Sequence, residues 1–175
     1  MPSRKRIWIA RDFLKCSGCR KCEIACSLHH EGKIWPEASR IRVFMPFPGL
    51  EVPHLCAQCD DYPCVKSCPV EALSVDEGTT AVIVDRDKCI ACGKCITACP
   101  GNVPFLHPKD GKSTICDLCE GEPECNKVCV EAGYNAIYVV KEKQSVIRKL
   151  FSRHPVDVAK DLAVNLYGEK GEKVI

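Results

Sequence analysis

The residues of this chain that could do chemistry are its cysteines. Sixteen occur among 175 residues, and they fall into four runs of four with none left over. The runs are Cys16, Cys19, Cys22 and Cys26; Cys56, Cys59, Cys64 and Cys68; Cys89, Cys92, Cys95 and Cys99; and Cys116, Cys119, Cys125 and Cys129. The first and third runs read C-x2-C-x2-C-x3-C, a spacing typical of proteins that bind [4Fe-4S] clusters. Four ligand sets predict four such clusters, and hence the movement of single electrons.

Two other uses of cysteine fit this spacing less well. Cysteines at i, i+3 and i+6 share one tight loop, which disfavours disulfides among them but lets three thiolates converge on one metal centre. Structural zinc usually takes one C-x2-C pair from each of two separated segments, which leaves the later cysteines of a run without a role. The second and fourth runs have wider middle gaps, C-x2-C-x4-C-x3-C and C-x2-C-x5-C-x3-C, and zinc at one or two sites stays an alternative there.

The fourth cysteine of each run is expected to serve a different cluster from the first three. In two-cluster iron–sulfur proteins, three close cysteines hold one cluster and the fourth ligates its partner. A gap of three residues places the fourth cysteine four positions after the third, on the same face of a short helix. This exchange should tie the runs together in pairs.

Composition and charge also favour a protein that binds iron–sulfur clusters. The chain has 25 Lys and Arg against 23 Asp and Glu, a formal charge of +2. An oxidised cluster with four thiolates carries about −2, so four of them would bring the holoprotein to roughly −6. The basic residues then compensate clusters rather than forming a nucleic-acid surface. The cysteines leave little apolar core, so the apo chain is expected to be largely unfolded.

The segments that flank the runs predict how the runs pair. Strand 7–10 leads into the first run as strand 81–85 leads into the third, and a turn at 76–79 makes the latter part of a hairpin. A further strand at 137–140 follows the fourth run. We expect the first strand to pair with the last. The first and fourth runs then form an outer pair, and the second and third an inner pair.

An insertion at 27–55 separates the first two runs. Within it, 40–44 alternates like a strand with one solvated face, and Trp35 and Phe47 are expected in the core. The insertion contains three histidines, His29, His30 and His54. Because every cluster already has four thiolates, these histidines are expected to pack or lie at the surface rather than bind metal.

The last 35 residues, 141–175, hold no cysteine. Segments 144–151 and 156–167 are predicted to form two short helices separated by Pro155, with Gly168 at the end of the second. The apolar stripe of the second helix is predicted to be Val156, Ala159, Ala163 and Leu166. This tail either packs back on the domain or docks a partner subunit.

With its four runs and long insertion, the chain resembles the polyferredoxin subunits of multisubunit oxidoreductases over roughly residues 7–140. Such subunits accompany dimethyl sulfoxide reductase, formate dehydrogenase and membrane-bound hydrogenase. Three local sequences are similar to the small iron–sulfur subunits of tungsten aldehyde oxidoreductases and benzoyl-CoA reductases. They are C-S-G-C-R-K-C-E-I-A-C-S from Cys16, H-E-G from His30 and S-R-I-R-V from Ser39.

The resemblance implies an α+β fold of tandem bacterial-ferredoxin-like modules with pseudo-twofold symmetry, short helices, small antiparallel hairpins and many loops. Residues 1–140 would form the four-cluster domain and 141–175 a helical tail. The implied outer clusters take Cys16, Cys19, Cys22 and Cys129, and Cys116, Cys119, Cys125 and Cys26. The implied inner clusters take Cys56, Cys59, Cys64 and Cys99, and Cys89, Cys92, Cys95 and Cys68. The wide gap of the fourth run makes its cluster the least secure of the four.

The implied function is electron transfer, with no substrate site in this chain and no catalytic residues of its own. The expected partners are a large tungsten or molybdenum pterin subunit and a second redox protein, such as a flavoprotein subunit or a ferredoxin. A free low-potential polyferredoxin, or a subunit of a hydrogenase, formate or CO dehydrogenase complex, is the alternative. No secretory signal or membrane span is evident, so a cytoplasmic location is expected. Backbone N–H groups near Gly18, Gly93 and Gly101, with nearby lysines, are the expected tuners of cluster potential.

Overall fold

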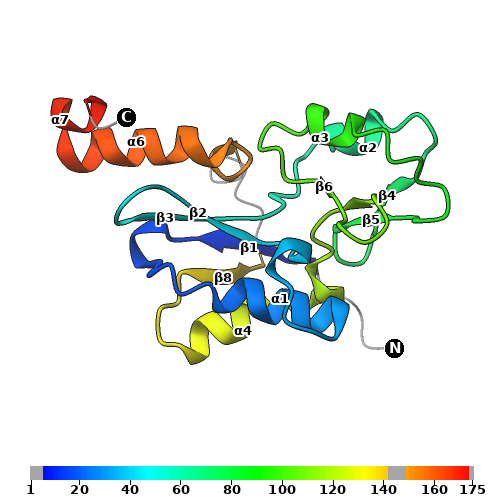
Figure 1. Ribbon diagram of the computed structural model, residues 1–175, viewed down its shortest axis with the longest axis horizontal. Helices are drawn as coiled ribbons and strands as arrows, with labels where there is room; N and C mark the ends of the chain where they lie inside the picture. The colour runs from blue at the N-terminus through cyan, green and yellow to red at the C-terminus, as the bar shows by residue number, and fades with distance from the viewer. Residues whose placement is uncertain (1–5, 142–148, 174–175) are drawn as a thin grey trace.

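The computed structural model describes residues 6–141 and 149–173, in which short helices and long loops connect small strand pairs (Figure 1). The strands form four separate antiparallel pairs. They are β1 (Trp8–Arg11) with β8 (Ile137–Val140), β2 (Arg42–Phe47) with β3 (Leu50–His54), β4 (Leu73–Val75) with β5 (Val82–Val84), and β6 (Phe105–Leu106) with β7 (Ser113–Thr114). This arrangement confirms the predicted α+β class with small antiparallel hairpins.

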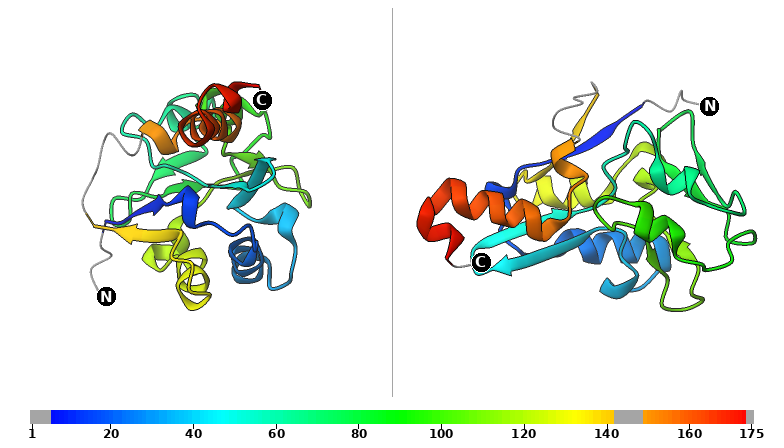
Figure 2. Two further views of the ribbon diagram at one scale, coloured as in Figure 1. Left: turned by 90° about the vertical axis from the view of Figure 1, so that its left-hand side faces the viewer. Right: turned by 90° about the horizontal axis from the view of Figure 1, so that it is seen from above.

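The pair β1–β8 joins the two ends of the cluster-binding segment. Trp8 lies opposite Val140 and Arg11 opposite Ile137, which confirms the predicted pairing of the first strand with the last. Helices α1 (Lys21–Glu31) and α4 (Glu124–Glu131) lie side by side on one face of this pair (Figures 1 and 2). The first and fourth cysteine runs are thereby brought together.

The hairpin β4–β5 is closed by the predicted turn. The backbone N–H and the hydroxyl of Thr79 both donate to Asp76 Oδ2, at 2.8 and 2.6 Å. Helices α2 (Pro63–Lys66) and α3 (Lys94–Ala98) pack against each other beside this hairpin (Figure 1). The second and third runs therefore meet here.

The two kinds of helix differ in where they end, and proline explains the difference. Helices α1 and α4 continue through the fourth cysteine of their runs, as predicted. Helices α2 and α3 end before Cys68 and Cys99, so the predicted i, i+4 helix is wrong for the inner runs. A residue that precedes proline avoids the helical region, and both cysteines are followed directly by proline. The outer runs have Ser27 and Val130 in that place, and their helices go on.

The insertion forms a hairpin over the outer pair. The predicted strand at 40–44 is realised as β2, but its partner β3 was not predicted. The N–H of Val43 donates to Glu23 Oε1 on α1 at 2.6 Å, which fixes the hairpin to the helix. Trp35 and Phe47 are half-buried, and Phe47 packs against the tail. Single 3₁₀ turns occur at η1 (Phe13–Lys15) and η2 (Pro36–Ala38), whereas η3 (Leu118–Gly121) is a turn with left-handed backbone angles at Leu118, Cys119 and Glu120.

The tail packs back on this hairpin. Helix α6 (Pro155–Tyr167) confirms the predicted second helix, Gly168 ends it, and a short α7 (Glu169–Glu172) follows. Most of the predicted first helix, at 144–148, lies outside the described residues. The predicted stripe is partly wrong, since Val156 and Leu166 are exposed. The buried face is Pro155, Val158, Ala159 and Ala163, because it is this face that meets Val52 of β3.

The core is built largely around sulfur. Eight of the sixteen cysteines, two from each run, are buried. They make up eight of the twenty buried residues of the main cluster, beside side chains such as Leu55 and Leu118. Within the described ranges, no helix is both long and apolar enough to cross a membrane.

One added proline should shorten an outer helix as the native prolines shorten α2 and α3. Val130→Pro should end α4 before Cys129, at a cost of about 3 kcal/mol, because proline removes a helical N–H and excludes its neighbour from the helix. Val130 is 49% exposed, so little packing is lost with it. The measurement is the denaturant midpoint of the anaerobically isolated protein, with Val130→Ala as the control. An unchanged midpoint for the proline variant would contradict the account.

Candidate metal centres

The sixteen cysteines line four cavities, four cysteines to each. We name each cavity after the run that supplies three of its cysteines. The first-run cavity is lined by Cys16, Cys19, Cys22 and Cys129; the fourth-run cavity by Cys116, Cys119, Cys125 and Cys26; the second-run cavity by Cys56, Cys59, Cys64 and Cys99; and the third-run cavity by Cys89, Cys92, Cys95 and Cys68. Three cysteines therefore come from one run and the fourth from its paired run.

Helices α1 and α4 produce this exchange in the outer pair. On α1, Cys22 faces the first-run cavity, whereas Cys26, one turn later, faces the fourth-run cavity. On α4, Cys125 and Cys129 do the reverse. Each helix therefore lies between two cavities and supplies one sulfur to each.

The donor sets fit a four-iron cluster better than zinc. All four cavities present four sulfurs, and none of the described residues that line them is Asp or Glu. Their volumes are similar, at about 320, 270, 390 and 290 Å³ for the first, fourth, second and third runs, solvent at the mouths included. A division of three and one is the pattern of two-cluster iron–sulfur proteins. Zinc sites divide two and two.

The cavities follow one another in a row. The first- and fourth-run cavities share α1 and α4, and the second- and third-run cavities share the paired helices α2 and α3. Two adjacent residue pairs connect the halves. Leu55 lines the fourth-run cavity and Cys56 the second-run cavity. Likewise, Cys116 lines the fourth-run cavity and Ile115 the second-run cavity. The order is therefore first, fourth, second, third.

Exposure marks the two ends of this row. Among the sixteen cysteines, Cys19 and Cys92 alone are exposed. Cys19 lines the first-run cavity and Cys92 the third-run cavity, which are the terminal cavities. The two central cavities have only buried or half-buried sulfurs.

Burial keeps most of these thiols protonated until a cation arrives. Desolvation raises the pKa of Cys22, Cys56 and Cys64 to about 12, and that of Cys119 to about 11. The thiolate is the metal ligand, so metal binding must displace these protons. Acidification therefore opposes loading, since protons and metal compete for the same sulfur atoms.

Backbone N–H groups point at several of the sulfurs. The fourth cysteine of three runs accepts such a bond: Cys26 from Arg40 at 3.3 Å, Cys68 from Ala72 at 3.3 Å, and Cys99 from Val103 at 3.4 Å. Cys56 accepts from Gln58 and Cys89 from Ser113, both at 3.4 Å. Such bonds stabilise the thiolate and raise the potential of a bound cluster.

The predicted tuning glycines have different roles. The N–H of Gly18 bonds to Cys16 and lowers the pKa of that thiol, against a larger rise from burial. Gly93 begins α3 with a φ of 72°, and it lines the third-run cavity. The carbonyl of Gly101 instead accepts a bond from His54 Nε2 at 2.7 Å. The donors from the insertion and from 103–113 were not predicted, because they reach the sulfurs through the tertiary fold.

One histidine lies closer to a cavity than the sequence indicated. His30 lines the fourth-run cavity, with Nε2 3.8 Å from Cys119 Sγ and 3.5 Å from Asp117 Oδ1, and Asp117 also pairs with Arg40. Burial lowers the pKa of His30 to about 4, so its ring is neutral at pH 7. With His29, it places two ring nitrogens beside the sulfur of Cys119. This occurs in the run with the widest gap, and non-ligation by His30 stays a prediction.

Residues 49–141 match the family model of the 4Fe-4S dicluster domain. The chain is 54% identical to the polyferredoxin-like subunit of aliphatic sulfonate oxidoreductase from Pyrococcus furiosus, over 95% of this chain and 96% of that protein. It is 30% identical to the thiosulfate reductase electron transfer subunit PhsB of Salmonella typhi, over 91% of this chain and 90% of that one. The chain belongs to the 4Fe-4S dicluster family, and its resemblance to polyferredoxin subunits of oxidoreductases is confirmed.

Two further relatives have shorter or looser matches. The electron transport protein HydN of Escherichia coli is 31% identical over 70% of this chain and 82% of its own length. A chain of the active site complex BamBC of benzoyl-CoA reductase with benzoyl-CoA is 25% identical, over 94% of this chain and 93% of that chain, with a TM-score of 0.44.

Two neighbouring cysteines of α1 provide a matched test of the crossed arrangement. Cys22→Ala should damage the centre in the first-run cavity, and Cys26→Ala the centre in the fourth-run cavity, because the two sulfurs face different cavities. Iron analysis and low-temperature EPR of the two variants would distinguish the centres. If both substitutions alter the same signal, the crossed arrangement does not describe ligation.

Proposed function

We propose that this chain is an iron–sulfur electron-transfer subunit that conducts single electrons through four [4Fe-4S] clusters within an oxidoreductase complex. The observation that carries the proposal is the row of four cavities, each lined by four cysteine sulfurs. Family membership and the electron-transfer relatives support it. When bound, such a cluster takes up and releases one electron at a time. The protein supplies the ligands, the spacing, and the dielectric around each centre.

We assign to each cluster the four cysteines of one cavity. The outer module then comprises runs 16–26 and 116–129, and the inner module runs 56–68 and 89–99. The insertion at 27–55 serves the outer module, since Arg40 donates to Cys26 and Val43 to Glu23. We assign the tail at 141–175 to a helical element apart from the two modules. Its docking of a partner stays a prediction, although one face of α6 already packs on β3.

The ends of the row are the places where electrons would enter and leave. At one end, exposed Cys19 shares its cavity with Tyr134, which is 40% exposed. At the other, exposed Cys92 shares its cavity with Ile90, which is 59% exposed. An exposed apolar side chain beside a terminal sulfur suits contact with a redox partner, because water is excluded there when the two proteins meet.

The relatives are named as subunits of oxidoreductases, which supports an assembly of this chain with partner proteins. A large catalytic subunit would occupy one end, and a flavoprotein subunit or a ferredoxin the other. The reaction then takes place in the large subunit, and this chain is not an enzyme in its own right. Tungsten or molybdenum in the large subunit, and a cytoplasmic location, stay predictions. The free polyferredoxin is the alternative, and co-purification with a large subunit distinguishes the two.

The cluster count is tested by analysis of the anaerobically isolated protein. We expect about 16 Fe per chain, and a broad absorption near 400 nm that bleaches on reduction and returns on oxidation. A colourless protein with zinc would contradict the function. About 12 Fe per chain would remove one cluster, and the fourth-run site is where we expect such a loss.

The two ends are tested by placing a charge at each. Tyr134→Glu and Ile90→Glu should each weaken the complex with a different partner by about tenfold or more, since burying a charge in an interface costs at least about 1.4 kcal/mol. Ile83→Glu is the control, because Ile83 is 40% exposed and lines none of the four cavities. All three variants should keep their iron. If neither end variant changes affinity for either partner, the ends are assigned wrongly.

A further inference from the structure

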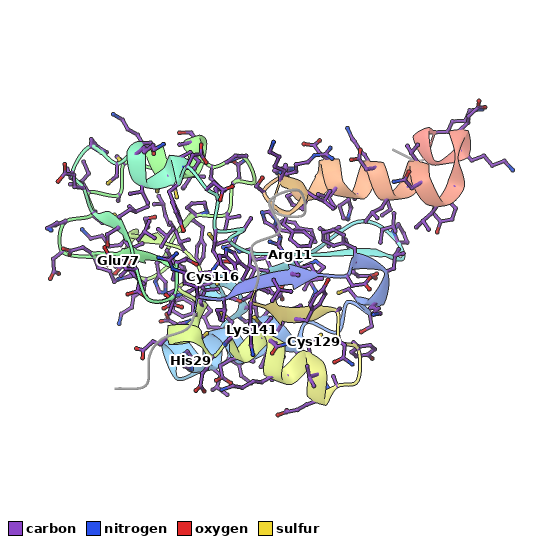
Figure 3. The ribbon with its side chains drawn as sticks, turned by 180° about the vertical axis from the view of Figure 1, so that it is seen from behind. Arg11, His29, Glu77, Cys116, Cys129 and Lys141 are labelled. Atoms are coloured by element: carbon purple, nitrogen blue, oxygen red, sulfur yellow. The ribbon has the colours of Figure 1, made fainter. Side chains whose placement is uncertain are left out.

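A buried arginine lies at the middle of the row, and no carboxylate of residues 6–141 or 149–173 forms an ion pair with it. Arg11 is the last residue of β1 (Figure 3). Its side chain is buried, with 4% of the residue exposed. Its Nη1 donates to the carbonyl of Phe151 at 3.4 Å, and its guanidinium lies 4.5 Å from the centre of the Phe151 ring. Within the described part of the chain, Nε and Nη2 are buried and have no hydrogen-bond partner.

Four other arginines pair with carboxylates. Arg20, Arg40, Arg86 and Arg153 pair with Glu23, Asp117, Asp110 and Asp161, respectively. A cation without such a partner is costly to bury. The groups whose negative charge would favour the Arg11 cation are three sulfurs, those of Cys56, Cys116 and Cys125. Burial lowers the pKa of Arg11 to about 10, which leaves it charged at pH 7.

These three sulfurs belong to two different cavities. Cys56 lines the second-run cavity, and Cys116 and Cys125 line the fourth-run cavity. The two cavities adjoin at the centre of the row. Ile9 of β1 lines the fourth-run cavity, and Ala57, which packs with Ala10 of β1, lines the second-run cavity. The end of β1, with Arg11, therefore lies at the junction where an electron would pass from the outer module to the inner one. Its sulfur neighbours are neutral thiols until metal binds, because burial raises their pKa.

We propose that Arg11 is a positioning residue for electron transfer, whose buried cation raises the reduction potentials of the two central clusters above the values they would otherwise have. This inference rests on the proposed function. Uptake of one electron from a partner adds one negative charge beside the guanidinium, and a nearby cation favours that state in a low dielectric. Arginine keeps its proton, so the charge returns to its former value when the electron moves on.

The geometry also explains why the donors of Arg11 are otherwise unpaired. A carboxylate partner would cancel most of the positive field before it reached the sulfurs. Among the described residues of the tail, Phe151 supplies a carbonyl and an aromatic ring, which hold the guanidinium in place without neutralising it. Phe151 thereby links the tail to the central cavities through Arg11, and its neighbour Ser152 lines the second-run cavity directly.

The test is a redox titration of the holoprotein, followed by EPR, for Arg11→Met and Arg11→Lys. Arg11→Met should move two of the four midpoint potentials to more negative values and leave the other two unchanged. Arg11→Lys keeps the charge and should stay near the wild type. Arg86→Met removes an exposed cation and is the matched control. Cys59→Ser and Cys119→Ser identify which signals belong to the second- and fourth-run cavities.

Each of the other possible results supports or overturns the proposed role of Arg11. Unchanged potentials in Arg11→Met, or equal shifts of all four, would overturn the proposal. If Arg11→Met loses iron while Arg11→Lys keeps iron and potentials, the charge is what the site requires, and the proposal stands. If both variants lose the same iron, Arg11 acts through its shape or its bond to Phe151, and the proposal is wrong. Wild-type protein without four clusters would instead refute the proposed function.

Discussion

Three cysteines on one tight loop can bind a metal centre from one side only. The rest of the structure depends on bringing a fourth sulfur to the other side. In this chain that sulfur comes from the paired run. Strands β1 and β8 join residues more than a hundred positions apart, and they set α1 beside α4 so that Cys26 and Cys129 each reach the neighbouring cavity. The strand pairs align the sulfur atoms, and short strands are sufficient for that.

The close packing of sulfur atoms also has an electrostatic consequence. Buried thiols resist ionisation, as the raised pKa values of Cys22, Cys56 and Cys64 show. Bound clusters would leave a net negative charge at each centre, and backbone N–H groups, with Arg11 at the centre of the row, oppose that charge. Without metal, eight buried cysteines and a guanidinium with two unsatisfied nitrogens form a poor core. Cluster insertion and folding are therefore expected to be one process.

Local sequence patterns predicted those features of the fold that depend on residues close together in the chain or on its internal repeat. The spacing of the cysteines, the turn at Asp76 and the pairing of the end strands all follow from neighbours in sequence or from the internal repeat. The helix prediction is wrong at Cys68 and Cys99 because the proline that follows each of them excludes the cysteine from the helical region. Strand β3, the β6–β7 hairpin and the buried face of α6 depend on contacts between distant segments, which a single sequence does not specify. His30 and Arg11 were missed for the same reason, since only the fold brings them to sulfur.

The central claim is that each cluster is bounded by three cysteines of one run and one of its partner run, with the four clusters in a single row. The most direct measurement is iron anomalous diffraction from crystals of the anaerobically isolated protein. The account predicts four iron-bearing centres, ordered first, fourth, second, third, with Cys26, Cys68, Cys99 and Cys129 each bound to the cluster of the paired run. A centre bound by all four cysteines of one run, or a branched arrangement of the four, would contradict it.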